Sequence, residues 1–293
     1  MYCHKPHPPD CSLFSLSVFS TLIDCLPPVN PRQAADKNGI IDFMSQYYTP
    51  KRQANLFNPK AQKPFKLSRT KIELFFNCPR CFYLDRRLGI AAPPGFPFAL
   101  NSAVDALLKK EFDIHRVRNQ IHPLMARYGL DAVPVAHENL DRWRHNFTGV
   151  QFLHAKTNFL VFGAIDDLWQ NAKGEYLVVD YKSTSKAGAI TALDQDWQIG
   201  YKRQMEVYQW LLRRNGLPVS DTGYFVYCNG QTDRAAFDGK LEFDVTLIPY
   251  TGDDGWVEKA LIGAQKCLQA DKIPKAGADC DYCQYAAARQ KVE

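Results

Sequence analysis

The chain has 293 residues, 46% of them hydrophobic, and a formal net charge of +5 at pH 7. This composition excludes a disordered chain, and the length allows one large core or two modest ones. The mild positive charge permits a nucleic-acid partner without requiring one. Nine cysteines are too few and too clustered for a disulfide framework, so their Cys-x-x-Cys pairs indicate metal chemistry in a reducing, cytoplasmic compartment.

Residues 1–43 differ in composition from the rest of the chain. They combine six prolines with a short apolar segment over 13–26. That segment contains Asp24 and lacks a small-residue cleavage motif, which argues against a signal peptide, and no stretch of the chain is suited to crossing a membrane. Because Met44 resembles a natural protein start, we expect residues 1–43 to be a disordered leader or an over-extended start.

Residues 44–66 are polar, basic and interrupted by prolines, which predicts a flexible arm. Basic residues are concentrated here and just beyond, with almost no acid before Glu73: Lys51, Arg52, Lys60, Lys63, Lys66, Arg69 and Lys71. This charge is equally typical of a solvated linker and of an arm that contacts phosphates. We expect the ordered domain to occupy residues 67–293.

The first half of the ordered domain is predicted to be mainly helical. The expected helices are residues 69–77, 80–88 and 98–112, followed by residues 118–147 in pieces. Ser68 is a suitable N-cap for the first helix, and the Cys78-Pro79 pair ends it.

Two apolar runs then carry acidic residues at equivalent places. Residues 159–165 lead into Asp166, residues 176–179 lead into Asp180, and a polar segment containing a glycine separates the runs. The pattern predicts a β-hairpin with Asp166 on the first strand and Asp180 and Lys182 on the second. Residues two apart in a strand share a face, so Asp180 and Lys182 project together and the hairpin brings Asp166 towards them. Two carboxylates and an ammonium group at a strand end suit a divalent metal that activates water.

Val178 and Val179 in succession predict a strand that is buried on both faces, with Asp180 at its end. This favours an active site over the alternative, which is a surface hairpin with a weak Asp–Lys ion pair. The side chain of Asp167 is expected to point away from that of Asp166.

The second half of the domain is predicted to alternate helices and strands. The expected elements are a helix over 197–214, strands over 222–228 and 241–249, and a helix over 254–270. Gln204 and Tyr208 share one face of the first helix, at i and i+4. Taken alone, this pair is more typical of an amphipathic helix with a buried tyrosine. Helices that flank a small mixed sheet give an α/β fold.

Three motifs occur in order along the chain: Gly163-x-x-Asp166, Asp180-x-Lys182 and Gln204-x-x-x-Tyr208. No single motif is specific, but the ordered set in a strand–strand–helix context resembles the PD-(D/E)XK nuclease superfamily, in its RecB-like branch. The resemblance covers roughly residues 67–286. It implies a restriction-endonuclease-like core, with a small mixed sheet flanked by helices.

The resemblance also implies roles for these residues. Asp166 and Asp180 would hold Mg²⁺ or Mn²⁺, and the carbonyl of Tyr181 would add a further oxygen ligand. Lys182 would stabilise charge on the attacked phosphate or orient the water nucleophile. The glutamine–tyrosine motif would contact substrate or support the metal ligands.

RecB-like members usually carry a histidine metal ligand on an early helix. The matching stretch here is residues 101–108, where Asp105 occupies the place of the histidine. An aspartate can bind Mg²⁺ or Mn²⁺, so Asp105 is a candidate third carboxylate ligand, with an exposed helical aspartate as the alternative. Lys182 is then expected to be the only cation near three carboxylates. The departure leaves open whether catalysis is retained.

Two Cys-x-x-Cys pairs, Cys78/Cys81 and Cys280/Cys283, lie at opposite ends of the domain. Four thiolates can hold one Zn²⁺ or one iron–sulfur cluster, which would join both ends of the domain. Some RecB-like nucleases, including AddB-type and CRISPR-associated exonucleases, carry a [4Fe-4S] cluster in this way. The resemblance therefore favours a [4Fe-4S] cluster, with Zn²⁺ as the alternative. Those relatives usually have one early and three late cysteines, so the two-and-two arrangement is a departure.

The sequence thus predicts a metal-dependent DNA nuclease that acts on DNA ends or single strands in repair, recombination or foreign-DNA processing. The alternative is a DNA-binding or structural protein of the same fold with weak or absent catalysis, which the aspartate at 105 favours. A zinc-stabilised interaction protein would require the hairpin acids to be coincidental. The sequence does not identify a helicase or recombination partner.

Overall fold

The computed structural model describes residues 51–95 and 98–293. The leader predicted over 1–43 and the start of the predicted arm lie outside the described residues. The described residues all belong to one compact unit of the chain.

This unit is an α/β domain, as predicted. Its strands are β1 (Phe65–Ser68), β2 (Ala132–Pro134), β3 (Val150–His154), β4 (Phe159–Gly163), β5 (Asp167–Asn171), β6 (Tyr176–Thr184), β7 (Thr222–Gly230) and β8 (Phe243–Thr251). Its helices are α1 (Arg69–Asn77), α2 (Pro79–Tyr83), the π-helix η1 (Leu84–Leu88), α3 (Ala99–Arg118), α4 (Pro123–Arg127), α5 (Leu140–Arg144), the 3₁₀ helix η2 (Asp196–Gln198), α6 (Ile199–Arg214), α7 (Val257–Gln269) and α8 (Asp281–Gln290).

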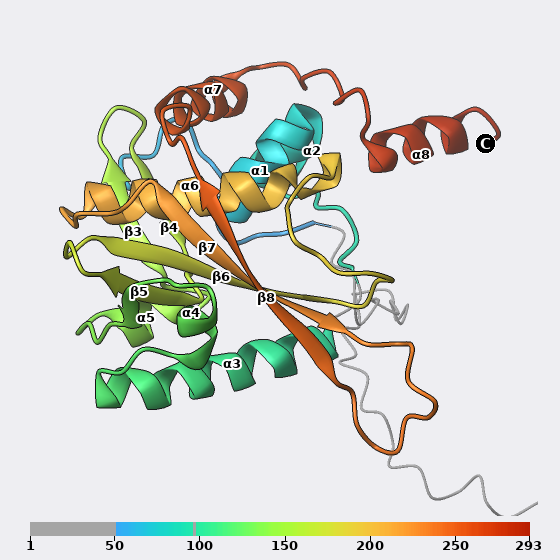
Figure 1. The fold of residues 1–293 in the computed structure, drawn as a ribbon. Coiled ribbons are helices and arrows are strands. Elements are labelled where there is room, and N and C mark those ends of the chain that lie inside the picture. Colours follow the sequence, from blue (N-terminus) through green and yellow to red (C-terminus); the bar gives the residue numbers. More distant parts are fainter. Residues whose placement is uncertain (1–50, 96–97) are drawn as a thin grey trace, which may run out of the picture. The chain divides into compact units, whose positions relative to one another are not determined.

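The strands form two sheets. The larger has the order β2-β5-β6-β7-β8 and is mixed, because β6 and β7 are parallel while the other neighbours are antiparallel. The smaller has the order β1-β4-β3. Helix α3 covers one face of the larger sheet and α6 covers the other (Figure 1).

Burial of β6 on both faces confirms the prediction made from its paired valines. Val178 and Val179 are both fully buried, the first in the core on the α6 side and the second in the core on the α3 side. Since side chains alternate along a strand, Asp180 and Lys182 share the α6 side while Tyr181 points towards α3.

The predicted first strand of the hairpin is wrong in its extent. The apolar run 159–165 is not continuous with Asp166 in one strand, because β4 ends at Gly163 and pairs in the smaller sheet. The amide of Ile165 donates to the carbonyl of Trp143 in α5 instead of to a strand, so the chain crosses between sheets here. The hairpin consists of β5 and β6, and Asp166 lies in the bend just before β5.

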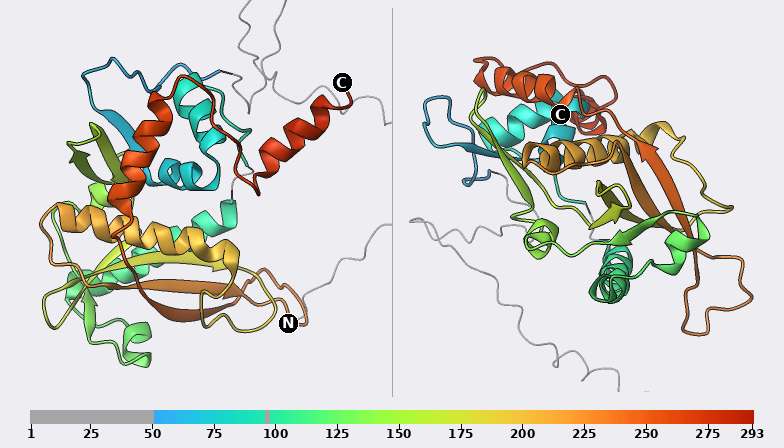
Figure 2. Two further views of the ribbon diagram at one scale, coloured as in Figure 1. Left: turned by 90° about the horizontal axis from the view of Figure 1, so that it is seen from above. Right: turned by 60° about the vertical axis from the view of Figure 1, so that its left-hand side comes forward.

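Most predicted helices are confirmed. Residues 69–77 form α1, residues 80–88 fall within α2 and η1, and the helix predicted over 98–112 extends to Arg118. Residues 118–147 contain α4 and α5 but also the short strand β2, which was not predicted. Figure 2 shows α1 and α2 beside α7, which pack against one another on the α6 side of the larger sheet.

The flexible arm predicted over 44–66 is wrong for its described part. The side chain of Phe57 is buried in the core, and its amide donates to the carbonyl of Arg86 at 2.7 Å. Phe65 begins β1, which pairs in parallel with β4, and its ring packs against that of Phe57. The burial of two aromatic rings offsets the cost of ordering a polar segment, so the ordered domain begins before residue 67. None of the described helices has the length and apolar character needed to span a membrane.

Candidate active site and cysteine cluster

Asp180 lies at the centre of the candidate active site. Its carboxylate is fully buried, one oxygen accepting a hydrogen bond from Gln204 Nε2 at 2.8 Å and the other pairing with Lys182 Nζ. Burial raises the pKa of Asp180 to about 6, and the charge of Asp166 acts in the same direction, while Lys182 and Arg69 oppose the rise. Keeping the Asp180 carboxylate charged therefore costs free energy unless a cation lies near it.

The hairpin places Asp166 opposite Asp180. Asp167 pairs with Val179, so the next position towards the strand end sets Asp166 against Asp180. The amide of Tyr181 donates to Asp166 Oδ2 at 2.9 Å, which fixes the carboxylate beside the middle of β6. The two acids and Lys182 therefore gather where β5 begins, as the hairpin predicted. The prediction that Asp180 ends its strand is wrong, because β6 continues to Thr184 by pairing with β7.

Gln204 connects α6 to this site. Its amide nitrogen donates to Asp180 and also to the hydroxyl of Tyr208, at 2.9 Å. Both side chains are almost completely buried, at 9% and 5% exposed. The spacing of one helical turn lets both residues face β6, so the pair contributes to the surroundings of Asp180 as well as to the core.

Gly163 makes room for Tyr208. A Cβ atom at this position would lie 2.6 Å from Cε1 of the tyrosine ring, closer than packed atoms tolerate. The ring therefore occupies the space that a side chain at Gly163 would need. This contact links the first sequence motif to the third.

We expect Gly163→Ala to destabilise the fold by about 1–3 kcal/mol, because the added methyl group must displace the ring of Tyr208 and strain its bond with Gln204. Urea unfolding measures the change. The matched control is Gly95→Ala, where an added Cβ atom meets nothing within 4 Å. Equal stability of the two variants would contradict this account of Gly163.

The surroundings of Asp105 correct one expectation. Lys109 Nζ pairs with Asp105 Oδ2 at 2.8 Å and lies 3.6 Å from Asp166 Oδ1, so Lys182 is not the only cation near the carboxylates. Burial raises the pKa of Asp105, and the charge of Asp166 adds to this. The Asp105–Lys109 pair sits one helical turn apart, and that spacing is the signal from which this cation could have been found.

The side chain of Asp167 points away from the site, as predicted. It is fully buried and accepts hydrogen bonds from Arg144 Nη2 at 2.7 Å, from the hydroxyl of Tyr181 at 2.9 Å and from Trp169 Nε1 at 3.1 Å, while Arg116 also pairs with it. Arg144 Nε in addition donates to the carbonyl of Asp166 at 3.0 Å. This buried network positions the bend that carries Asp166, and nothing in the sequence pattern indicated it.

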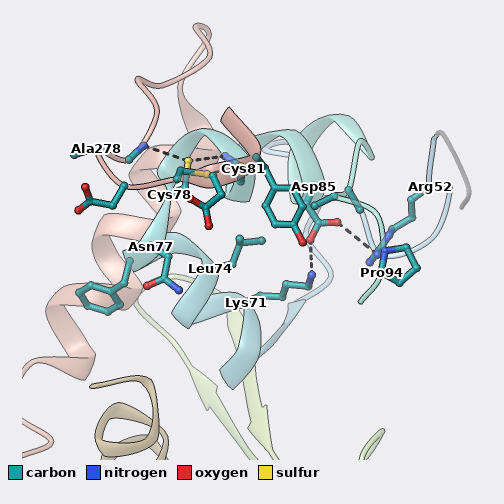
Figure 3. A pocket seen from close by; sticks show the side chains of 17 residues that line it. Arg52, Lys71, Leu74, Asn77, Cys78, Cys81, Asp85, Pro94 and Ala278 are labelled. Atoms are coloured by element: carbon teal, nitrogen blue, oxygen red, sulfur yellow. Dashed lines mark hydrogen bonds and ion pairs between the residues drawn. The ribbon is translucent and has the colours of Figure 1, made fainter. Parts of the chain in front are cut away.

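Two of the basic residues before Glu73, Arg52 and Lys71, stabilise the fold through ion pairs. Asp85 is buried and pairs with Lys71 at 2.6 Å, with Arg86 at 2.7 Å and with Arg52 at 3.5 Å. Figure 3 shows Arg52 and Lys71 directed towards Asp85 in a pocket that Cys78 and Cys81 also line. Arg52 and Lys71 are therefore engaged in ion pairs with a buried acid.

The four paired cysteines converge as predicted. Sγ of Cys78 lies 3.7 Å from that of Cys283, and Sγ of Cys81 lies 3.6 Å from those of Cys280 and Cys283. Among the described residues they are the one group of three or more potential Cys, His, Asp or Glu ligands whose atoms all lie within 4.8 Å of one another. Asp105, Asp166 and Asp180 do not approach that closely as a set.

Backbone amides support the cluster. The amides of Gly277 and Cys81 donate to Cys78 Sγ at 3.2 and 3.4 Å. Burial acts to raise the pKa of Cys78, but these hydrogen bonds outweigh it and the pKa is lowered to about 7. Cys78 and Cys81 come from the start of α2, and Cys280 and Cys283 from the start of α8, so the cluster joins the two ends of the domain.

Comparison with protein-family models gives a match over most of the chain. Residues 66–288, about three quarters of the chain, match the model of the PD-(D/E)XK nuclease superfamily. No curated protein matches the chain.

Proposed function

Because the chain belongs to the PD-(D/E)XK nuclease superfamily, we propose that it is a metal-dependent deoxyribonuclease of the RecB-like branch. Members of this superfamily generally hydrolyse phosphodiester bonds with the help of a divalent metal, so the substrate is a nucleic acid. DNA ends and single strands, in repair, recombination or foreign-DNA processing, are the finer part of the proposal.

The single observation that carries the proposal is the group formed by Asp166, Asp180 and Lys182 at the end of the β5–β6 hairpin. The group combines two acids, one of them fully buried, with an ammonium group, and Gln204 supports it from α6. Burial of the Asp180 carboxylate costs desolvation free energy, and its pKa remains raised although Lys182 is near. Binding of a hard cation beside Asp180 would offset this cost, which supports the proposal.

In the proposed mechanism, Asp166 and Asp180 would hold Mg²⁺ or Mn²⁺, with the carbonyl of Tyr181 as a further ligand. When bound, such an ion supplies a Lewis acid for the phosphate oxygens and lowers the pKa of water. Lys182 holds positive charge beside the attacked phosphate or orients the water nucleophile. Gln204 holds Asp180 through a hydrogen bond to Oδ1, and Tyr208 holds Gln204 in turn.

Asp105 is proposed as a third carboxylate ligand. The ammonium group of Lys109 lies between Asp105 and Asp166, at 2.8 Å from the first carboxylate and 3.6 Å from the second. Asp105 would be free to hold an ion once Lys109 turned towards solvent, which its long side chain allows. The weak-catalysis alternative is favoured if Lys109 instead remains between the acids.

For the four cysteines we propose one tetrahedral Zn²⁺ in preference to the [4Fe-4S] cluster that the resemblance favours. Zn–S bonds of about 2.3 Å in a tetrahedron place the sulfur atoms about 3.8 Å apart. Three of the six pairs of sulfur atoms lie 3.6 or 3.7 Å apart and all four atoms lie within 4.8 Å of one another, which fits that arrangement. A [4Fe-4S] cluster binds each thiolate to a different iron and holds the sulfur atoms considerably farther apart. Thiolates that hold a metal also fit a reducing, cytoplasmic location.

The experiment that tests the function is a cleavage assay on the purified full-length protein. Labelled single-stranded DNA, duplex DNA and RNA of one sequence are each incubated with Mg²⁺, with Mn²⁺ and with EDTA. We expect cleavage of DNA that requires the divalent ion and is fastest on single strands or ends. Binding of DNA without cleavage under every condition would favour the catalytically inactive alternative.

A further inference from the structure

An exposed aromatic side chain lies beside the candidate active site. Trp197 belongs to η2, directly before α6, and 50% of its surface is exposed. It is the only one of the five tryptophans to be exposed, and all five lie in the described residues. A large apolar ring in this position gains little from the fold, so it calls for another explanation.

A continuous row of contacts joins Trp197 to Lys182. Lys182 Nζ lies 4.7 Å from the ring centroid of Tyr201, and the Tyr201 ring meets that of Trp197 edge-on at 5.6 Å. Lys186 Nζ then lies 4.4 Å over the Trp197 ring. Two aromatic rings therefore lie between two cations in a row that runs outwards from the candidate active site, in the order Lys182, Tyr201, Trp197, Lys186.

The outer part of this row is held in place by the fold. The buried side chain of Asn229 accepts from the amide of Lys186 at 2.8 Å and donates to its carbonyl at 2.9 Å. Gln195 and Gln198 form a capping box around η2, which fixes the backbone at Trp197. A ligand that binds here does not have to order the surface first, which lowers the cost of binding.

The chemistry of the row fits one kind of ligand. An exposed indole offers a flat π-face on which any unpaired base can stack, and an ammonium group attracts the neighbouring phosphate. Lys186 makes no ion pair with any described residue, so its charge is available to such a phosphate. A duplex hides the faces of its bases within the stack and shows only edges and phosphates.

We propose that Trp197 and Lys186 form a stacking platform that selects single-stranded nucleic acid and leads the strand to Lys182. The proposal rests on the nuclease function above and adds to it the surface that chooses the substrate. Trp197 is a substrate-selecting residue here, and the hydrolysis itself does not depend on it.

The test is the affinity of the full-length protein, in EDTA, for a short fluorescein-labelled single strand and for the matching duplex. We expect Trp197→Ala to weaken single-strand binding about tenfold, within the range of single stacking contacts, and to change duplex binding less than about twofold. Trp197→Phe keeps a π-face and should restore most of the affinity. Lys186→Ala should lower the slope of log Kd against log salt concentration by about 0.7, the value for one phosphate contact on a single strand.

Tyr285→Ala is the control, because Tyr285 is 69% exposed on α8 and contacts none of these residues. Unchanged binding by Trp197→Ala would overturn the platform, and equal losses on single strands and duplexes would overturn the selection. Absence of cleavage by the parent protein would contradict the proposed function instead. The binding measurement in EDTA tests the stacking platform whether or not the parent protein cleaves DNA.

Discussion

Asp180→Asn is expected to abolish DNA cleavage, with a fall in kcat of about a thousandfold or more. The substitution keeps the size of the side chain but removes the negative charge that we propose holds the divalent ion. Such an ion contributes several kcal/mol to stabilisation of the transition state. The variant should still fold, since an amide oxygen can accept the hydrogen bond that Gln204 donates. Single-turnover cleavage at saturating Mg²⁺ or Mn²⁺ measures the loss, and circular dichroism checks the fold.

Asp131→Asn is the matched control, because Asp131 is an exposed aspartate just before β2. Asp166→Ala should lose cleavage to a similar extent. Asp105→Ala is a graded comparison that should weaken metal binding more than DNA binding, since phosphates are held largely by basic residues. If Asp105→Ala changes neither metal affinity nor cleavage, Asp105 is an ordinary helical aspartate. Normal cleavage by the Asp180→Asn variant would show that the site assignment is wrong.

Loss of one cluster cysteine is expected to remove the metal and much of the stability together. Binding of a structural metal is coupled to folding and can supply about 10 kcal/mol or more in small zinc domains. Cys81→Ser and Cys283→Ser should therefore release the ion and lower Tm by at least about 10 °C. Elemental analysis and a sulfide assay on protein purified without oxygen identify the metal, and calorimetry follows Tm.

The control is Cys267→Ser, because Cys267 is half-buried and lies outside the cluster. It should keep the metal. Stoichiometric zinc without sulfide is the expected content of the parent protein. Iron with acid-labile sulfide would overturn the zinc proposal and leave the join between α2 and α8 intact. Absence of any metal would contradict both the zinc proposal and the metal-mediated connection between α2 and α8.

The sequence determined the core of the fold and the composition of the site. The paired valines Val178-Val179 predicted a buried strand, and the polar segment before it predicted a hairpin that brings Asp166 and Asp180 together. Local pattern placed the first strand of that hairpin wrongly, since it is β5 and not the apolar run before Asp166. Helical spacing likewise placed Gln204 and Tyr208 on one face. The four cysteines could be grouped because few residue types can hold a metal and their spacing is characteristic.

Only the tertiary structure decided how the chain crosses between the two sheets at residues 164–166. That crossing depends on a hydrogen bond between Ile165 and Trp143, which no local pattern encodes. The anchoring of Arg144 on Asp167 and the position of Lys109 between two acids are contacts of the same kind. Such contacts form between residues that are distant in the sequence or are selected by packing, so they exist only once the elements have come together. The row from Lys182 to Trp197 also arises in this way, because a loop and a helix meet beside β6.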